Sequence, residues 1–443
     1  MKINYATQRN IALLLGFLFF PLFVGVMVAL STFSKTLIHK EPAPLEFTQQ
    51  KKNKGSKSSN LPKVALLLDH KGVQISDVLY PYALLQESKA FEVYTVAQTK
   101  ALIPTTGALA IYPDFDFKSL PAVDYWVIPA LLDPTQLDLV QFAKERFPKA
   151  KGILAVCEGS RLLAHSGILR GKKATSHFMS NEAVKKTYPQ VFWDFDHRWV
   201  KEKNWISTAG VTGSIDGTLE FIRTFASPKD AKRVEDNMAL SQVSNETRTK
   251  EPLSFQDLFY IMTQAAFQWN KRGVLLEIHP GADEFFLATT LDLIPRSFNS
   301  QIVTVGATRK IYETKRGLKI VPVIDSHYEV DADVRIQIPS TEKDLIHFPI
   351  PLEVQQDIDW SQKKSGTAIP TVLNQLAEWD GNESASWVAK LIEFPWNVDK
   401  KTSNQNRNTV WIVWFLLGMT GAGLVWLFDW RIRVGREAKK NAK

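Results

Sequence analysis

The single cysteine of this sequence, Cys157, is the residue whose neighbours best suit covalent catalysis. It follows the apolar run Gly152 to Val156 and precedes a helix-forming segment, with a glycine, Gly159, two residues further on. A strand, a tight turn and a helix in this order form an elbow that strains the backbone of a nucleophile and presents its side chain at the carboxyl edge of a sheet. The N-terminus of the following helix would favour thiolate over thiol. The alternative interpretation is a buried structural cysteine, which is common for free thiols.

The elbow needs a sheet to hold it, and from residue 64 short apolar runs alternate with helical stretches. Strands are expected at 64–68, 91–97, 124–130 and 152–156, and helices near 76–88 and 135–146. Such alternation is typical of βαβ units, in which helices cover both faces of a mainly parallel sheet. We therefore predict an α/β domain over residues 64–235.

Three segments carry a resemblance to a known family. The run AVCEGSRLLAHSGILRGKKATSHF, the later STAGVTGSIDGTLEFI and the early GVQISDVLYP resemble successive signatures of the ThiJ/PfpI superfamily over about residues 64–226. The resemblance implies the fold of class I glutamine amidotransferases, a flavodoxin-like three-layer sandwich with a parallel sheet. It also implies a site in which Cys157 is the nucleophile, His177 a proton carrier and Asp77 an orienting acid. Asp77 could instead cap a helix, and His177 could be a hydrogen-bonded residue at a strand end.

Two positions depart from the pattern of that family. Ala130 and Leu131 stand where many relatives have a glycine pair that supplies an oxyanion donor. Glu158 places a carboxylate beside the thiol, where a like charge disfavours thiolate. Two functions therefore stay open: a cysteine-dependent hydrolase, hydratase or amidase-like enzyme acting on a small carbonyl, amide or isonitrile-type substrate, or a non-catalytic sensor or binding module. For the enzyme we expect the thiol to alkylate at about pH 6 faster than a model thiol, and Asp77→Ala to slow that reaction.

No cofactor, metal or nucleic-acid partner is predicted. The sequence has no glycine-rich phosphate loop, and His70, His165 and His197 have no metal-ligand spacing with one another or with the cysteine. Much of the net charge of +8 lies in a linker and in the C-terminal tail. The resemblance extends to the amidase-like domain of AraC-type regulators, but the helix-turn-helix pair that binds DNA in those proteins is not predicted here.

Two apolar runs flank the domain and predict membrane anchoring. Residues 11–30 and 409–428 each approach the 20 residues that a helix needs to cross the hydrocarbon of a bilayer. The basic tail, 429–443, places the C-terminus in the cytoplasm by the positive-inside rule, and two spans return residues 1–10 to the same side. We expect a multi-pass protein of the cell membrane, with a flexible linker at 31–63 and the main domain outside the cytoplasm.

A weak internal repeat follows the first domain. Gly72 recurs as Gly281, 209 positions later, and several further pairs keep this spacing. These are His70 with His279, Pro113 with Pro322, Asp116 with Asp325, and Asp124 with Asp333. The echo stops before any counterpart of the elbow. We therefore predict that 236–400 is a degenerate second α/β copy, with Phe286 at the position of Asp77 and a helix, turn and helix around Gly381.

Overall fold

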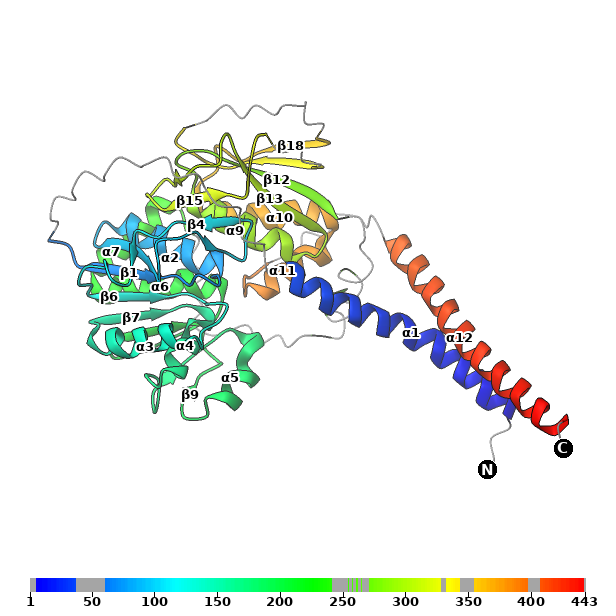
Figure 1. Ribbon diagram of the computed structural model, residues 1–443. Coiled ribbons are helices and arrows are strands. Elements are labelled where there is room, and N and C mark those ends of the chain that lie inside the picture. The colour runs from blue at the N-terminus through cyan, green and yellow to red at the C-terminus, as the bar shows by residue number, and fades with distance from the viewer. Residues whose placement is uncertain are drawn as a thin grey trace. The chain divides into compact units, whose positions relative to one another are not determined.

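The computed structural model of the 443-residue chain describes residues 5–36, 60–240, 271–327, 332–342, 354–396 and 407–441, with 254, 257, 260, 261 and 264 (Figure 1). It divides into two compact units. One holds Met1–Thr36, Pro252–Lys271 and Lys400–Lys443, and the other holds Leu37–Glu251 and Arg272–Asp399. The helix predicted over 252–269 lies almost entirely outside the described residues.

The first unit contains two long antiparallel helices, α1 (Tyr5–Thr36) and α12 (Arg407–Asn441), which lie side by side (Figure 1). They approach closely at glycines, since a β-carbon built on Gly421 would lie 2.3 Å from the carbonyl oxygen of Gly16. The rings of Phe17 and Phe415 meet edge to face 5.9 Å apart. Small residues at a helix contact are typical of helices that pair in lipid.

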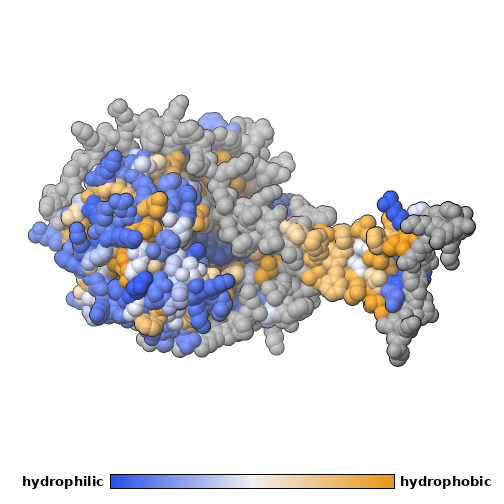
Figure 2. Space-filling view, turned by 60° about the horizontal axis from the view of Figure 1, so that its bottom comes forward, coloured by the Kyte–Doolittle hydropathy of each residue, from blue (hydrophilic) through white to orange (hydrophobic). Residues whose placement is uncertain are grey.

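Large apolar side chains cover the outside of this helix pair. Phe19, Phe23 and Phe428 are each at least 60% exposed, and Figure 2 shows hydrophobic colouring over much of the described surface of the pair. Within the described residues, one stretch, Thr7–Gly25, is long and apolar enough to cross a membrane. The first predicted span lies in α1 and the second in α12, and the second crossing stays a prediction.

A seven-stranded sheet forms the centre of the first half of the α/β unit. Its strands lie in the order β10-β11-β7-β6-β1-β2-β5, and every neighbouring pair is parallel except β10 with β11. Their bounds are β1 (Lys63–Leu67), β2 (Glu92–Ala97), β5 (Phe115–Asp116), β6 (Tyr125–Ile128), β7 (Gly152–Ala155), β10 (Trp199–Glu202) and β11 (Trp205–Thr208). The prediction of an α/β fold with a mostly parallel sheet is confirmed.

Helices cover this sheet in two groups. The helices α2 (Ile75–Ser88), α6 (Val211–Phe225) and α7 (Pro228–Met238) pack against one another, while α3 (Leu137–Arg146) packs against α4 (Ser160–His165). The apolar residues of β1 and β6 are buried between the layers, as the continuous hydrophobic runs of a parallel sheet require. The predicted domain end at residue 235 falls inside α7, because the helix continues to Met238 to bury that side chain.

The second half carries its own parallel sheet, in the order β16-β13-β12-β17-β18. Its strands are β12 (Arg272–Ile278), β13 (Ser300–Gly306), β16 (Ile324–Asp325), β17 (Val334–Gln337) and β18 (Gln356–Asp359). The helix α9 (Glu284–Arg296) joins β12 to β13. The helices α10 (Ala368–Asp380) and α11 (Asn382–Leu391) turn at Gly381, whose φ of +87° suits a glycine, so this predicted turn is confirmed.

A third sheet joins the two halves into one compact unit. It has the order β14-β15-β4-β3, and β15 of the second half pairs antiparallel with β4 of the first. The strands are β3 (Ile103–Pro104), β4 (Leu109–Ile111), β14 (Tyr312–Glu313) and β15 (Lys319–Pro322). The region predicted as 236–400 is thus an α/β structure that packs against the first half. Its origin as a degenerate ThiJ/PfpI copy stays a prediction.

Candidate functional site

The backbone around Cys157 forms a strained elbow at the end of β7. Cys157 has a φ of +54°, in the left-handed region that costs energy for a residue with a side chain. Its amide donates to Thr208 Oγ1 at 3.2 Å. Gly159 is required two residues later, because a β-carbon there would lie 2.0 Å from the carbonyl oxygen of Ile128. The surrounding structure therefore holds the cysteine in an unfavourable conformation, as the sequence pattern predicted.

The thiol itself is buried, with 8% of Cys157 exposed. Burial raises the pKa of Cys157 well above that of a free thiol, and the negative charges of Asp77 and Glu158 raise it further. The helix after the elbow, α4, has only six residues. Desolvation and the two nearby carboxylates therefore oppose the thiolate that the helix terminus was expected to favour.

Asp77 lies in the first turn of α2 and is fully buried. Its Oδ2 accepts a hydrogen bond from the amide of Ala130 at 3.1 Å, whereas its buried Oδ1 has no hydrogen-bond partner within the described part of the chain. Burial raises the pKa of Asp77 to about 7. Asp77 does not cap its helix, since Gln74 holds the N-cap position. The bond to Oδ2 also occupies the amide of Ala130, at the position where the resemblance implied an oxyanion donor.

Glu158 follows the cysteine directly and pairs with Arg161. Arg161 Nη1 donates to Glu158 Oε2 at 3.0 Å, and both side chains are partly exposed. The adjacent carboxylate thus points along the short helix toward a cation and solvent. Its charge still acts on both Cys157 and Asp77 and opposes ionisation of each.

His177 follows the short strand β8 (Lys173–Ala174) and caps a 3-10 turn. Its Nδ1 accepts from the amide of Met179 at 3.4 Å. A β-carbon built on Gly210 would lie 3.4 Å from His177 Cδ2 and 3.6 Å from Glu393 Oε1. The neighbouring Ser176 Oγ donates to the carbonyl oxygen of Cys157 at 3.4 Å. The segment that carries His177 is therefore tied to the elbow, and the imidazole shares the space over Gly210 with a carboxylate of the second half.

Two residues that sequence reasoning missed reach this region from α9. Asp292 Oδ1 accepts from Gln74 Nε2 at 2.8 Å and Asp292 Oδ2 accepts from Ser76 Oγ at 2.9 Å. Asp292 also binds Arg296, whose Nε donates to Oδ1 at 2.9 Å. The charge of Arg296 acts on Asp77 and Cys157 and favours their ionised forms. The only signal in the sequence was an Asp and an Arg four positions apart on a helix.

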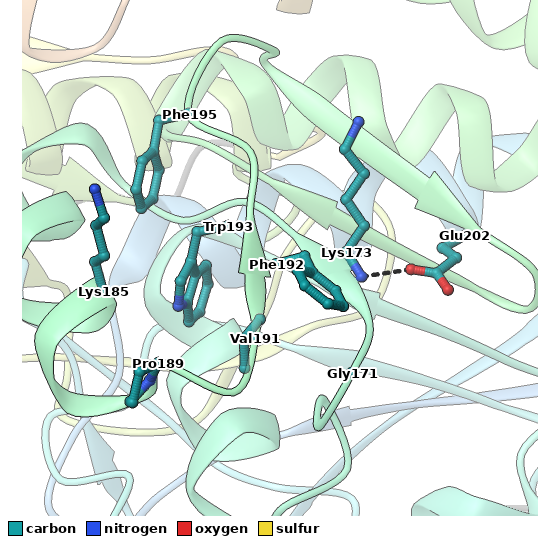
Figure 3. A pocket seen from close by; sticks show the side chains of 9 residues that line it. All are labelled: Gly171, Lys173, Lys185, Pro189, Val191, Phe192, Trp193, Phe195 and Glu202. Carbon is teal, nitrogen blue, oxygen red and sulfur yellow. Dashed lines mark hydrogen bonds between the residues drawn. The ribbon is translucent and has the colours of Figure 1, made fainter.

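A separate pocket of about 810 Å³ lies near β8 and β9 (Phe192–Trp193). Figure 3 shows the rings of Phe192, Trp193 and Phe195 around it, and the backbone amide of Lys173 donates to the carboxylate of Glu202 at its edge. Cys157, Asp77 and His177 do not line this pocket. Among the described residues no group of three His, Cys, Asp or Glu side chains could hold a metal ion.

Comparison with known proteins finds similarity over the first half of the α/β unit. The model of the DJ-1/PfpI family matches residues 62–224. An isonitrile hydratase of Pseudomonas putida is 27% identical over 169 residues, covering 37% of this chain and 72% of the relative. Deglycase PfpI of Pyrococcus furiosus is 27% identical over 143 residues, covering 30% and 81%. The crystal structure of a THiJ/PfpI family protein from Pseudomonas syringae matches with a TM-score of 0.37 and 24% identity, covering 44% of this chain and 81% of that one.

Proposed function

Because residues 62–224 form a domain of the DJ-1/PfpI family, we propose that this chain is a membrane-anchored enzyme with Cys157 as nucleophile. The reaction is hydration or hydrolysis of a small electrophile of the carbonyl, amide or isonitrile class. The observation that carries the proposal is Cys157 held at a φ of +54°, within the electrostatic reach of a buried Asp77 whose pKa is raised to about 7. Strained backbone and perturbed acids both concentrate at functional sites.

Asp77 suits the role of acid and base. A carboxyl group with a pKa of about 7 is present in both protonation states at neutral pH. In the proposed reaction, ionised Asp77 takes the proton of the Cys157 thiol as the sulfur bonds to the electrophilic carbon of the substrate. Asp77 then delivers that proton to the substrate. Water adds to the same carbon, the carbon–sulfur bond breaks and sulfur regains a proton. For hydration the net change is the addition of one water molecule. For hydrolysis of an amide, the proton from Asp77 goes to the nitrogen, the amine leaves as its bond to carbon breaks, and water then releases the acid from sulfur.

The names of two relatives support this substrate class. One is an isonitrile hydratase and another is a deglycase. Adding water to an isonitrile needs a proton donor and a nucleophile at one carbon, which the Cys157 and Asp77 pair provides. The assignment of His177 as a second proton carrier rests on its connection to the elbow through Ser176.

Membrane anchoring is the second part of the proposal. The apolar side chains that cover α1 and α12 would be costly in water over so large an area. Their close contact at Gly16 and Gly421 suits a hairpin of two spans. The basic tail that ends α12 then lies in the cytoplasm and the α/β unit outside it.

A non-catalytic sensor or binding module is the rival function. The observation that favours it is the raised pKa of the buried Cys157 thiol, since a neutral thiol is a weak nucleophile. In that case the same site would hold a small ligand without turning it over.

Turnover by the full chain in detergent micelles separates the two. An alkyl isonitrile, a small aldehyde and a small amide are offered to the wild type, to Cys157→Ser and to Asp77→Asn. The enzyme proposal expects turnover of one of them and its loss in Cys157→Ser. In Asp77→Asn it expects a large fall in kcat together with loss of the pH dependence near pH 7. His165→Gln is the control, because His165 ends α4 and pairs with Tyr188, so its replacement should leave kcat unchanged. A Cys157→Ser variant as active as the wild type would contradict the proposal.

A further inference from the structure

Where the two halves of the α/β unit meet, a residue of the first half contacts the residue at the equivalent position of the second half. Tyr80 and Thr289 are 209 positions apart, and the hydroxyl of Tyr80 lies 2.7 Å from Thr289 Oγ1. Ile111 on β4 pairs with Ile320 on β15, which is again 209 positions later. This is the same spacing that the sequence echo keeps. In a two-fold interface a residue close to the axis meets the equivalent residue of the other subunit.

The strand orders of the two halves agree with this relation. The first half has β5-β2-β1-β6-β7 within its sheet, and the second has β16-β13-β12-β17-β18. The corresponding helices α2 and α9 pack against each other, with Tyr80 and Phe285 rings 4.8 Å apart. The second half therefore lies against the first as one subunit of a two-fold dimer lies against the other.

The two halves differ in the residues that could take part in catalysis. Phe286 is buried at the position that corresponds to Asp77, and the second half has no cysteine. One half thus holds Cys157 and Asp77, while the other presents the equivalent surface with no cysteine and with a phenylalanine in place of the acid.

We infer that the second half is a permanently attached partner that completes the Cys157 site, and that it supplies Arg296 as the anion-binding group for substrate. The inference rests on the proposed function for the position of the site. It adds the substrate feature that Arg296 would recognise, a carboxylate or a developing oxyanion.

The contacts around α9 connect Arg296 through Asp292 to the start of α2, the helix that carries Asp77. Ser76 and Gln74, in and just before the first turn of α2, both bind Asp292. Asp77 is the next residue of that turn. Asp292 in turn fixes the Nε and Nη2 edge of Arg296, at 2.9 and 2.8 Å. This network spans the interface between the halves and orients the guanidinium.

One edge of the guanidinium is left for a ligand. Within the described residues Nη1 of Arg296 makes no hydrogen bond, and the side chain is 23% exposed. A guanidinium with one edge held by a carboxylate can present its remaining N–H groups to a second oxyanion. Such a donor is needed here, because the amide of Ala130 is already bound to Asp77.

Alkylation of Cys157 by a charged and by a neutral reagent tests the inference. Iodoacetate carries a carboxylate and iodoacetamide does not, so the ratio of their second-order rate constants reports anion binding beside the thiol. In the full chain we expect Arg296→Gln to lower the iodoacetate to iodoacetamide ratio about tenfold, as for loss of one charge-assisted hydrogen bond. The variant also raises the pKa of the thiol, but this slows both reagents equally and leaves the ratio unaffected.

Two further variants sharpen the result. Arg335→Gln is the matched control, because Arg335 also lies in the second half and pairs with Asp357, and its loss should leave the ratio unchanged. Arg296→Lys keeps the charge beside Asp292 and should keep part of the preference, which covers the case that the glutamine variant does not fold. An unchanged ratio in folded Arg296 variants would overturn the inference while leaving the proposed nucleophile intact.

A non-reactive probe tests the role of Arg296 separately from the proposed function. If neither reagent labels Cys157 in the wild type, the nucleophile is lost from the proposal, and sodium acetate becomes the probe. Acetate should then raise the melting temperature of the wild type and of Arg335→Gln but not of Arg296→Gln. Equal stabilisation of all three would overturn the role of Arg296.

Discussion

Replacement of Asp77 by Asn should change how the stability of the protein depends on pH. Burial raises the pKa of Asp77 from 3.8 to about 7, so between these values the folded protein holds a proton that the unfolded chain releases. Stability from this group is present below the unfolded pKa and is lost as pH rises through the folded one. The wild type should therefore lose stability between about pH 4 and pH 7.

The size of the effect follows from the pKa difference. Each unit of pKa is worth 1.36 kcal/mol, so the rise to about 7 corresponds to about 4 kcal/mol at pH 8. Asparagine is neutral at every pH and can still accept the bond from Ala130. Its amide N–H groups would occupy the position of the unpartnered Oδ1, at a cost of ~1–3 kcal/mol. We expect Asp77→Asn to be more stable than the wild type at pH 8 by about 1–3 kcal/mol.

Thermal unfolding of the full chain in detergent between pH 4 and pH 8 measures the stability difference between Asp77→Asn and the wild type. The difference between variant and wild type isolates Asp77 from other buried acids such as Asp216, whose pKa is also raised by burial, to about 6. Asp133→Asn is the control, because its hydrogen bond with Lys71 lowers the pKa of Asp133 to about 2, and the group is ionised in the folded protein over the whole range. Parallel stability curves for Asp77→Asn and the wild type would refute the reasoning.

Three further outcomes are expected. Gly159→Ala should prevent correct folding of the elbow, seen as a fall in melting temperature, because its β-carbon would overlap the carbonyl oxygen of Ile128. Gly421→Leu should separate α1 from α12 while Gly423→Leu should not, since no atom lies within 4 Å of a β-carbon on Gly423; a disulfide engineered between the helices would report the loss. A protease added to intact cells should digest residues 31–408 and spare a C-terminal tag, and a protected domain with a digested tag would invert the topology.

The fold of the first half was readable from the sequence because its signals are local. Apolar runs of four or five residues predicted β1 and β7. Gly159, two residues after Cys157, predicted a tight turn, and the structure leaves no room there for a side chain. The second half gave a weaker signal. The sequence evidence for its strands was a spacing of 209 positions between similar residues, with no single motif, although its strand order matches that of the first half.

The electrostatics of the site could not be read from the sequence. The sequence pattern placed a helix terminus beside Cys157 and predicted a thiolate, but the charge state depends on burial and on neighbours distant in sequence. Arg296 and Asp292 come from a helix more than a hundred residues away from Cys157, and only the packing of α9 on α2 brings them near. The sequence also predicted that loss of Asp77 would slow alkylation, whereas the structure predicts the opposite above the pKa of Asp77.

The pH profile of iodoacetamide labelling at Cys157 tests the pairing of this thiol with Asp77 most directly. The wild type should be labelled with a midpoint above the value of about 8.5 for a free thiol, because burial and the ionised Asp77 oppose thiolate. Asp77→Asn removes that charge, so its midpoint should fall and labelling at about pH 8.5 should be faster than in the wild type. A wild-type midpoint below that of a free thiol, or slower labelling in Asp77→Asn, would contradict the buried, electrostatically coupled pair.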